Sequence, residues 1–297
     1  MSFERNARAA LLYFDLFDFP LTEEELYSFL PVKEHKEEFT LKLRKAGLRS
    51  SDGLYHLREG HEIASLRKTQ QARAAKMLAA ARFMGNLIRH FPFVRGVYLS
   101  GSLSKGVDSG DADIDFFIIT AESRLWICRA ILTMFKKIFF LNSKKFLCLN
   151  YFLSENHLEI PEKNVFTATE LVTLQPLHNE ELLRKLLAAN EWIYNFYPNF
   201  KLKWETKRLR RSFVQKVFEL PLSDGYTEKL DNKLMKYYRK LWAKRYRQFV
   251  REKREFLFRS TPYSSKVHPK DYQSIVLDAY EERLKTENLE RLTRLDG

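Results

Sequence analysis

Apolar and polar positions recur along the first sixty residues with the period of short helices. Apolar positions at helical spacing predict a first helix over residues 7–19. Thr22 followed by Glu25 has the capping-box pattern that begins a second helix, and a third is expected over 36–46. A turn and a short apolar run follow at 50–57. Three short helices and a small hairpin are typical of a winged helix.

The pattern then changes to one long helix followed by apolar strands. A helix is expected over 60–90, and the next apolar runs predict strands over 94–100, 112–120 and 145–153, with a helix over 124–139 between the last two. From residue 168 onward the pattern is mainly helical, with breaks at prolines. We therefore expect an α/β (α+β) protein: a winged-helix-like segment over 1–60, a small mixed sheet over 61–165 and a helical C-terminal domain over 166–297.

Composition fits a folded protein that stays out of the membrane. The chain has 297 residues, 45% of them apolar, which is enough to bury a core and suits about two domains. The most apolar stretch, 125–141, contains Arg129, Lys136 and Lys137, so it predicts a buried helix and no membrane partner. No secretory signal precedes the first helix, and the only two cysteines lack paired spacing. A cytoplasmic location is expected.

Positive charge is concentrated in one part of the chain. The net charge is +13, and residues 201–260 hold 19 Lys/Arg against 7 Asp/Glu, whereas residues 1–60 hold 9 against 11. The basic region, which includes "KRLRRSFVQKVF" and the segment around Trp242, interleaves cations with aromatic residues. It can bind nucleic acid or another polyanion, although the aromatic positions also fit the apolar face of a core-packed helix. The acidic winged-helix-like segment favours a packing role over DNA binding.

The stretch that carries candidate chemistry is Gly101-Ser102, ten intervening residues, and then Asp113-Ile114-Asp115. Alternation along a strand places Asp113 and Asp115 on the same face. Two adjacent carboxylates are unfavourable unless a cation joins them, and Mg²⁺ (or Mn²⁺) takes carboxylate, water and phosphate oxygens. A Gly-Ser turn at the end of the preceding strand allows backbone N–H groups to approach a phosphate closely.

This stretch, "LSGSLSKGVDSGDADIDFFIIT", resembles the signature of the DNA-polymerase-β-like nucleotidyltransferase superfamily. The resemblance implies that Gly101 and Ser102 contact the triphosphate of a nucleotide and that Asp113 and Asp115 bind the metal. More loosely, residues 1–200 resemble a group of uncharacterised bacterial proteins with a winged-helix-like segment before such a domain, in "LLYFDLFDFPLT" and "LCLNYFLSENHLEI".

The sequence departs from that signature at the third carboxylate, which the superfamily supplies from a neighbouring strand. Asn150 stands at the expected position; its amide oxygen can coordinate a metal, but it is no general base. Glu155 or Glu159 could substitute, the acceptor could activate itself, or the site could be inactive.

Other polar residues near the motif have either a functional or a purely structural interpretation. Lys105 either contacts phosphate or is a loop lysine. Arg124 and Arg129 either reach a phosphate or lie on a solvated helix face. Asp108 and Asp111 fit turns better than metal ligands.

The expected function is metal-dependent transfer of a nucleoside monophosphate from an NTP to an acceptor hydroxyl, with the acceptor unidentified. The alternative is a catalytically silent regulator that binds nucleotide or nucleic acid and retains the fold.

Overall fold

The structure of the protein is a computed structural model that describes residues 2–58, 62–108, 110, 112–143, 145–204, 213–220, 225–289, 291 and 293–295. Asp111 and the whole of the basic run 207–212 lie outside the described residues. Within the described ranges, no helix combines the length and the apolar character that crossing a membrane requires.

The N-terminal segment has the three expected helices and the expected hairpin, which a short third strand extends into a small sheet. The elements are α1 (Phe3–Asp15), β1 (Leu21–Thr22), α2 (Glu23–Ser28), α3 (Lys36–Lys45), β2 (Ser50–Ser51) and β3 (Leu54–Tyr55), with the strands antiparallel in the order β1-β3-β2. The capping box of α2 is present: Glu25 N–H donates to the Thr22 hydroxyl, and Thr22 N–H donates to the Glu25 carboxylate. The first helix begins and ends earlier than expected, since Ser2 caps it and Asp18 adopts a left-handed φ of 52° after its end.

A long helix, α4 (Glu62–Ile88), leads from this segment to a five-stranded mixed sheet. Its strands are β4 (Val94–Ser100), β5 (Asp115–Thr120), β6 (Cys148–Ser154), β7 (Gln175–His178) and β8 (Ser264–Lys266), in the order β7-β4-β5-β6-β8. Only β5 and β6 are parallel, and α6 (Leu125–Phe140) connects them. The expectation of a mixed α+β fold with a small mixed sheet is confirmed.

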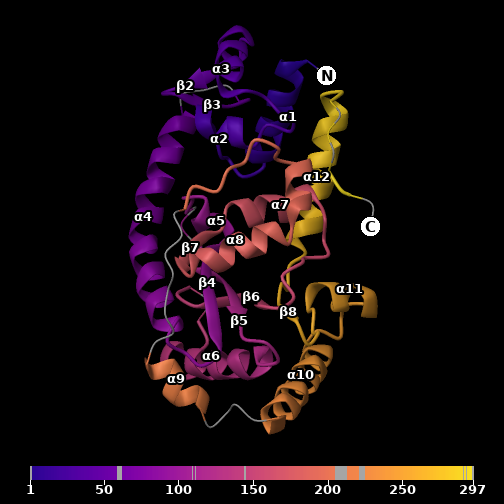
Figure 1. The fold of residues 1–297 in the computed structure, drawn as a ribbon. Coiled ribbons are helices and arrows are strands. Elements are labelled where there is room, and N and C mark those ends of the chain that lie inside the picture. The colour runs from indigo at the N-terminus through magenta and orange to yellow at the C-terminus, as the bar shows by residue number, and fades with distance from the viewer. Residues whose placement is uncertain are drawn as a thin grey trace.

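Helices cover both faces of this sheet and form two apolar cores (Figure 1). Strand residues Phe117 and Ile119 belong to the core shared with α1, α2, α3, α7 (Val165–Val172), α8 (Glu180–Ala188), the 3-10 helix η1 (Glu191–Asn195) and α12 (Tyr272–Thr286). Phe116 and Ile118 belong to the other core, with α4, α6, α10 (Gly225–Arg245) and α11 (Arg251–Leu257). A short helix, α9 (Phe213–Glu219), lies near the lower end of α4.

The region after residue 165 is not only helical, because it contributes β7 and β8 to the edges of the sheet. Pro176, expected to break the structure, lies inside β7, where it pairs with Tyr98. An edge strand tolerates proline because one row of its N–H groups needs no partner in the sheet. The last long helix, α12, returns to the first: Tyr280 OH donates to Ala9 O, and Figure 1 shows α1 and α12 side by side.

Candidate active site

The helical turn α5 (Gly101–Ser104), directly after β4, brings Gly101 against the first residue of β5. Ser100 pairs with Asp115 across the antiparallel strands. Gly101 has a φ of +71°, and a Cβ at this position would lie 2.5 Å from Asp115 Oδ2. Glycine is therefore required twice here, for the left-handed backbone and for the close approach of the carboxylate.

The two aspartates flank a buried isoleucine, as the alternation predicted. β5 begins at Asp115 and not at Ala112, but Ile114 already donates its N–H to Lys145 O and accepts at its O from Cys148 N. Its side chain is buried, whereas those of Asp113 and Asp115 are partly exposed. Among the described residues, Asp113 has no hydrogen-bonded or ion-paired partner.

Asn150 lies directly beside Asp115. In the register of β5 and β6, Phe116 pairs with Leu149 and Phe117 with Tyr151, so Asn150 is the extra residue of a β-bulge. Its Nδ2 donates to Asp115 Oδ1 over 2.5 Å, and its Oδ1 accepts from Cys148 Sγ at 3.1 Å. The residue expected at the third carboxylate position is thus next to the aspartate pair.

The surroundings of Asp115 raise its pKa to about 7. Burial is the largest cause; the nearby charges of Glu170 and Asp113 also raise the pKa, while hydrogen bonds from Cys148 and Asn150 lower it. A divalent cation would offset the effects of burial and of the neighbouring negative charges, because it stabilises the carboxylates in their charged form.

Glu170, which the sequence did not suggest, reaches the same place from α7. Its Oε2 accepts from Gly101 N–H at 3.3 Å, and its Oε1 accepts from Lys105 Nζ at 2.7 Å. Lys105 Nζ also donates to Gly101 O at 3.0 Å. The two contacts of Glu170 span 69 and 65 residues. A lone glutamate in a helix carries no local sequence signal of such distant contacts, so only the folded structure reveals Glu170 as a site residue.

Of the remaining polar residues, Ser102 and Asp108 belong to the segment that joins β4 to β5, whereas Glu155 and Glu159 follow β6. Ser102 is exposed beside the turn, and Asp108 forms the expected turn by accepting from Gly110 N–H at 2.7 Å. Glu155 cannot replace the third carboxylate, since its N–H binds Thr120 O at the opposite end of β5, about 17 Å along the strand. Glu159, exposed, pairs with Lys163.

Neither arginine of α6 is placed to bind a phosphate beside Asp115. Arg124 lies beyond the far end of β5 and stacks over Phe93 at 5.8 Å. Arg129 is buried on the opposite face of the sheet, against Phe152 and Trp242. The phosphate-binding interpretation of both residues is wrong.

The residues present suit a cation that shares its ligands with a bound anion. Within the described ranges, no group of three or more His, Cys, Asp or Glu side chains is arranged to hold a metal. Mg²⁺, however, is commonly held by one or two carboxylates together with water and substrate phosphates. Asp113 and Asp115 supply two carboxylates, and rotation of the Asn150 amide would present its oxygen to the same point.

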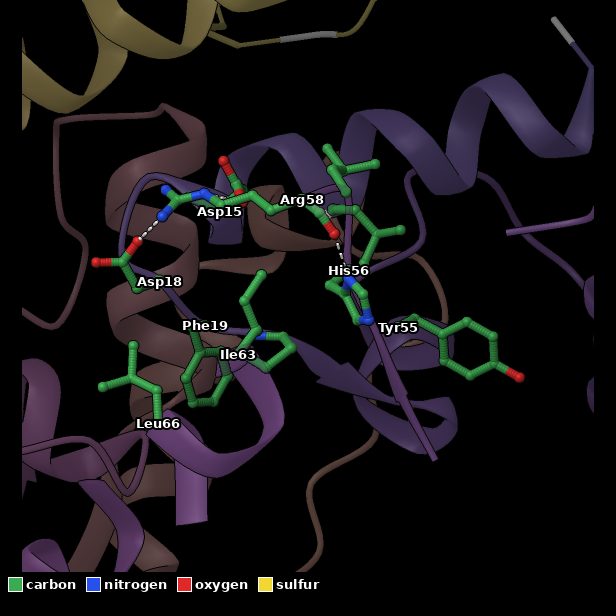
Figure 2. Close-up of a pocket in the computed structure, with 11 residues that line it drawn as sticks. Asp15, Asp18, Phe19, Tyr55, His56, Arg58, Ile63 and Leu66 are labelled. Carbon is green, nitrogen blue, oxygen red and sulfur yellow. Dashed lines mark hydrogen bonds and ion pairs between the residues drawn. The ribbon is translucent and has the colours of Figure 1, made fainter. Parts of the chain in front are cut away.

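A recess elsewhere in the molecule belongs to different elements. Figure 2 shows it in the N-terminal segment, where Arg58 pairs with Asp15 and Asp18 beside Phe19 and His56. Both of its carboxylates are already ion-paired, Asp15 also with Arg283, and none of the sequence-predicted site residues lines it.

Comparison with known proteins adds no relative: no protein-family model, no curated protein and no solved structure matches the chain.

Proposed function

We propose that the protein is a metal-dependent nucleotidyltransferase that moves a nucleoside monophosphate from an NTP to an acceptor hydroxyl, and that its core is that of the DNA-polymerase-β-like superfamily. The observation that carries the proposal is the contact between Gly101 and the Asp115 carboxylate, with Asp113 unpaired beside it. The Gly101 N–H and the carboxylates of Asp113 and Asp115 then lie close together where β4 ends and β5 begins.

Each residue has a defined part in this proposal. Asp113 and Asp115 would hold Mg²⁺ (or Mn²⁺), which when bound neutralises charge on the triphosphate as pyrophosphate leaves. Gly101 N–H and Lys105 would bind phosphate oxygens, with Ser102 at the open side of the turn. Asn150 orients the Asp115 carboxylate through its hydrogen bond and leaves the acceptor hydroxyl without a carboxylate base at this position.

Isothermal titration calorimetry with each NTP, in Mg²⁺ and in EDTA, tests the binding step. We expect Mg²⁺-dependent binding that is lost in the double variant Asp113→Asn, Asp115→Asn. Asp278→Asn, which neutralises an exposed carboxylate on α12, is the matched control and should bind like the wild type. Equal affinity in the wild type and the double variant would remove the metal-site assignment.

The second candidate function is a silent regulator that binds nucleotide or nucleic acid without turnover. Asn150 favours it, since an amide rather than a carboxylate lies beside Asp115 at this position. Release of pyrophosphate separates the two: an enzyme releases it from at least one NTP when supplied with an acceptor, whereas the regulator binds without release.

A further inference from the structure

The two donors proposed for phosphate already hold an anion of the protein itself. The Glu170 carboxylate accepts from Gly101 N–H with one oxygen and from Lys105 Nζ with the other. The Lys105 side chain is 15% exposed and that of Glu170 31% exposed, so the ion pair is partly shielded from water. A carboxylate that bridges a backbone N–H and an ammonium makes the same kind of contacts as two phosphate oxygens.

The helix that carries Glu170 is anchored firmly. Asn164 caps α7 by accepting from Thr167 N–H, and the buried Thr169 hydroxyl contacts Val165 O and Tyr197 OH. The neighbouring residues Ala168 and Leu171 are in the apolar core. The backbone of Glu170 is therefore fixed, while its side chain, on the more open side of the helix, can leave the turn by rotation about its own bonds.

We propose that Glu170 is an internal substitute for a phosphate group, and that it restricts the site to a polyphosphate carrying a divalent cation. This inference rests on the proposed function. An incoming phosphate competes with a carboxylate for the same donors and approaches Asp113 and Asp115 as well. A free monophosphate exchanges one anion for another in a field of three carboxylates, so it gains little.

For a polyphosphate that carries a divalent cation, the electrostatic attraction to the site exceeds the repulsion. Its cation is attracted by Asp113 and Asp115, and its oxygens take over the donors that Glu170 releases into water. Glu170 thus acts as a specificity determinant: it raises the concentration of any anion needed to occupy the turn, most of all in the absence of metal.

The test compares Glu170→Gln with the wild type by calorimetry, using inorganic phosphate, tripolyphosphate and ATP as probes, each with Mg²⁺ and with EDTA. Glutamine keeps the size of the side chain and removes its charge. We expect Glu170→Gln to bind Mg²⁺–ATP at least ~10-fold more tightly, since the ligand no longer has to displace a charge-assisted hydrogen bond from the same donors. Tripolyphosphate binding in EDTA should rise further, because the variant lacks one of the three repelling carboxylates.

Glu181→Gln on α8, where an exposed glutamate pairs with Lys185, is the matched control and should leave every affinity unchanged. Lys105→Met in the Glu170→Gln background should remove the gain, which shows that the released donor is the one the ligand uses. Thermal melts in each buffer confirm that the variants are folded.

Each outcome separates the inference from the function on which it rests. Weaker Mg²⁺–ATP binding in Glu170→Gln would make Glu170 a ligand of the metal complex and overturn the inference, while the proposed function stands. Unchanged affinity would overturn the inference in the same way. Absence of binding in both proteins would overturn both, whereas binding by Glu170→Gln alone would support the inference and show that the wild-type site is closed by its own carboxylate.

Discussion

At the scale of single residues, the two strands that flank β5 bring a side chain and a backbone turn against the Asp115 carboxylate. Cys148 pairs with Asp115, and alternation along β6 places Asn150 on the same face, where its amide donates to Asp115 Oδ1. The bulge at Asn150 changes the pairing of the residues that follow, so that Tyr151 pairs with Phe117. Asn150 and Gly101 therefore approach the same carboxylate from the two neighbouring strands, and substitution of either residue tests its contact with Asp115.

Gly101→Ala should destabilise the protein and remove nucleotide binding, because the added methyl group meets Asp115 Oδ2. Gly106→Ala is the matched control: Gly106 has a φ of +73° and nothing within 4 Å of its Cβ position. Both variants carry the left-handed penalty of about 1–2 kcal/mol, and only Gly101→Ala adds an overpacking cost of about 1–3 kcal/mol. Urea unfolding measures the difference; equal losses in the two variants would contradict the close approach.

Asn150→Asp should lower stability in EDTA and increase the stabilisation given by Mg²⁺. A third carboxylate next to Asp115 repels it in the absence of metal and adds an anionic ligand in its presence. If the wild type turns over slowly for lack of a base, the variant should turn over ~10²-fold faster or more. Asn150→Ala, which loses the hydrogen bond without adding charge, is the control in thermal melts with EDTA and with Mg²⁺. A Mg²⁺ response no larger than that of the wild type would show that this position does not serve the metal.

At the scale of elements, the two faces of α10 have separate roles. Trp242 is buried, and Tyr238 packs against Trp126 of α6, so the interpretation of the aromatics as core is confirmed for these two residues. It is wrong for Tyr237 of the same helix and for Phe213 and Phe218 of α9, which are exposed. Leu241, expected to pack, is 38% exposed. The outer face instead presents exposed lysines at helical spacing, and none has an ion-pair partner among the described residues: Lys229, Lys233, Lys236, Lys240 and Lys244. A continuous row of unpaired cations would attract a polyanion, so binding of nucleic acid or another polyanion at this face stays a prediction.

Replacing Lys233, Lys236 and Lys240 together by Gln should weaken binding of single-stranded RNA or duplex DNA to the full chain and lower the slope of log K against log salt by about 2–3. The control removes the same charge from α3 of the winged-helix-like segment, where Lys36, Arg44 and Lys45 are exposed. Anisotropy titrations over a range of salt concentrations measure both. The α3 variant should bind like the wild type; a larger loss there would assign binding to the winged helix.

At the scale of the whole molecule, the three segments expected from the sequence share one of the two cores. Phe14 and Phe39 of the N-terminal segment lie in the same cluster as Phe117 of the sheet and Tyr280 of α12. Asn199 further joins the segments by accepting from Glu34 N–H. The winged-helix-like segment is thus packed onto the rest of the chain. Binding of nucleic acid by this segment is therefore best tested in the full-length protein.

Burial of His178 in the sheet makes the stability of the molecule depend on pH. The residue lies on the edge strand β7, is 8% exposed, and has a pKa lowered to about 4 by burial, with smaller effects of Arg89 and His90. A histidine that is neutral when folded and has an unfolded pKa near 6.5 gives full stability above that value. Its contribution is lost as the pH falls from 6.5 to 4, by up to about 3 kcal/mol.

Urea unfolding of the wild type and of His178→Gln, between pH 7 and pH 4, measures this contribution. The wild type should lose stability more steeply, because the glutamine variant has no proton to take up at this position. Other titrating groups act equally in both proteins, so parallel curves would show that His178 is not held neutral by the fold.

The sequence by itself determined the local features. The capping box at Thr22, the strand over 94–100, the glycine at the turn and the spacing of Asp113 and Asp115 around a buried isoleucine all depend on residues a few positions apart. Caps, turns and alternation act over such distances, so the pattern of residues contains them. Even there, strand and helix ends shifted by a few residues, since hydrogen bonds with distant partners set where an element stops.

Only the tertiary structure decided which distant groups meet these local features. Glu170 reaches Gly101 across 69 residues, and β7 and β8 join the sheet from the mainly helical region. These segments are short or polar, and their own patterns carry too weak a signal to show where they pair. Their positions follow from the burial of both faces of one sheet. This burial needs residues from the whole chain, so it cannot be read from the pattern of any single segment.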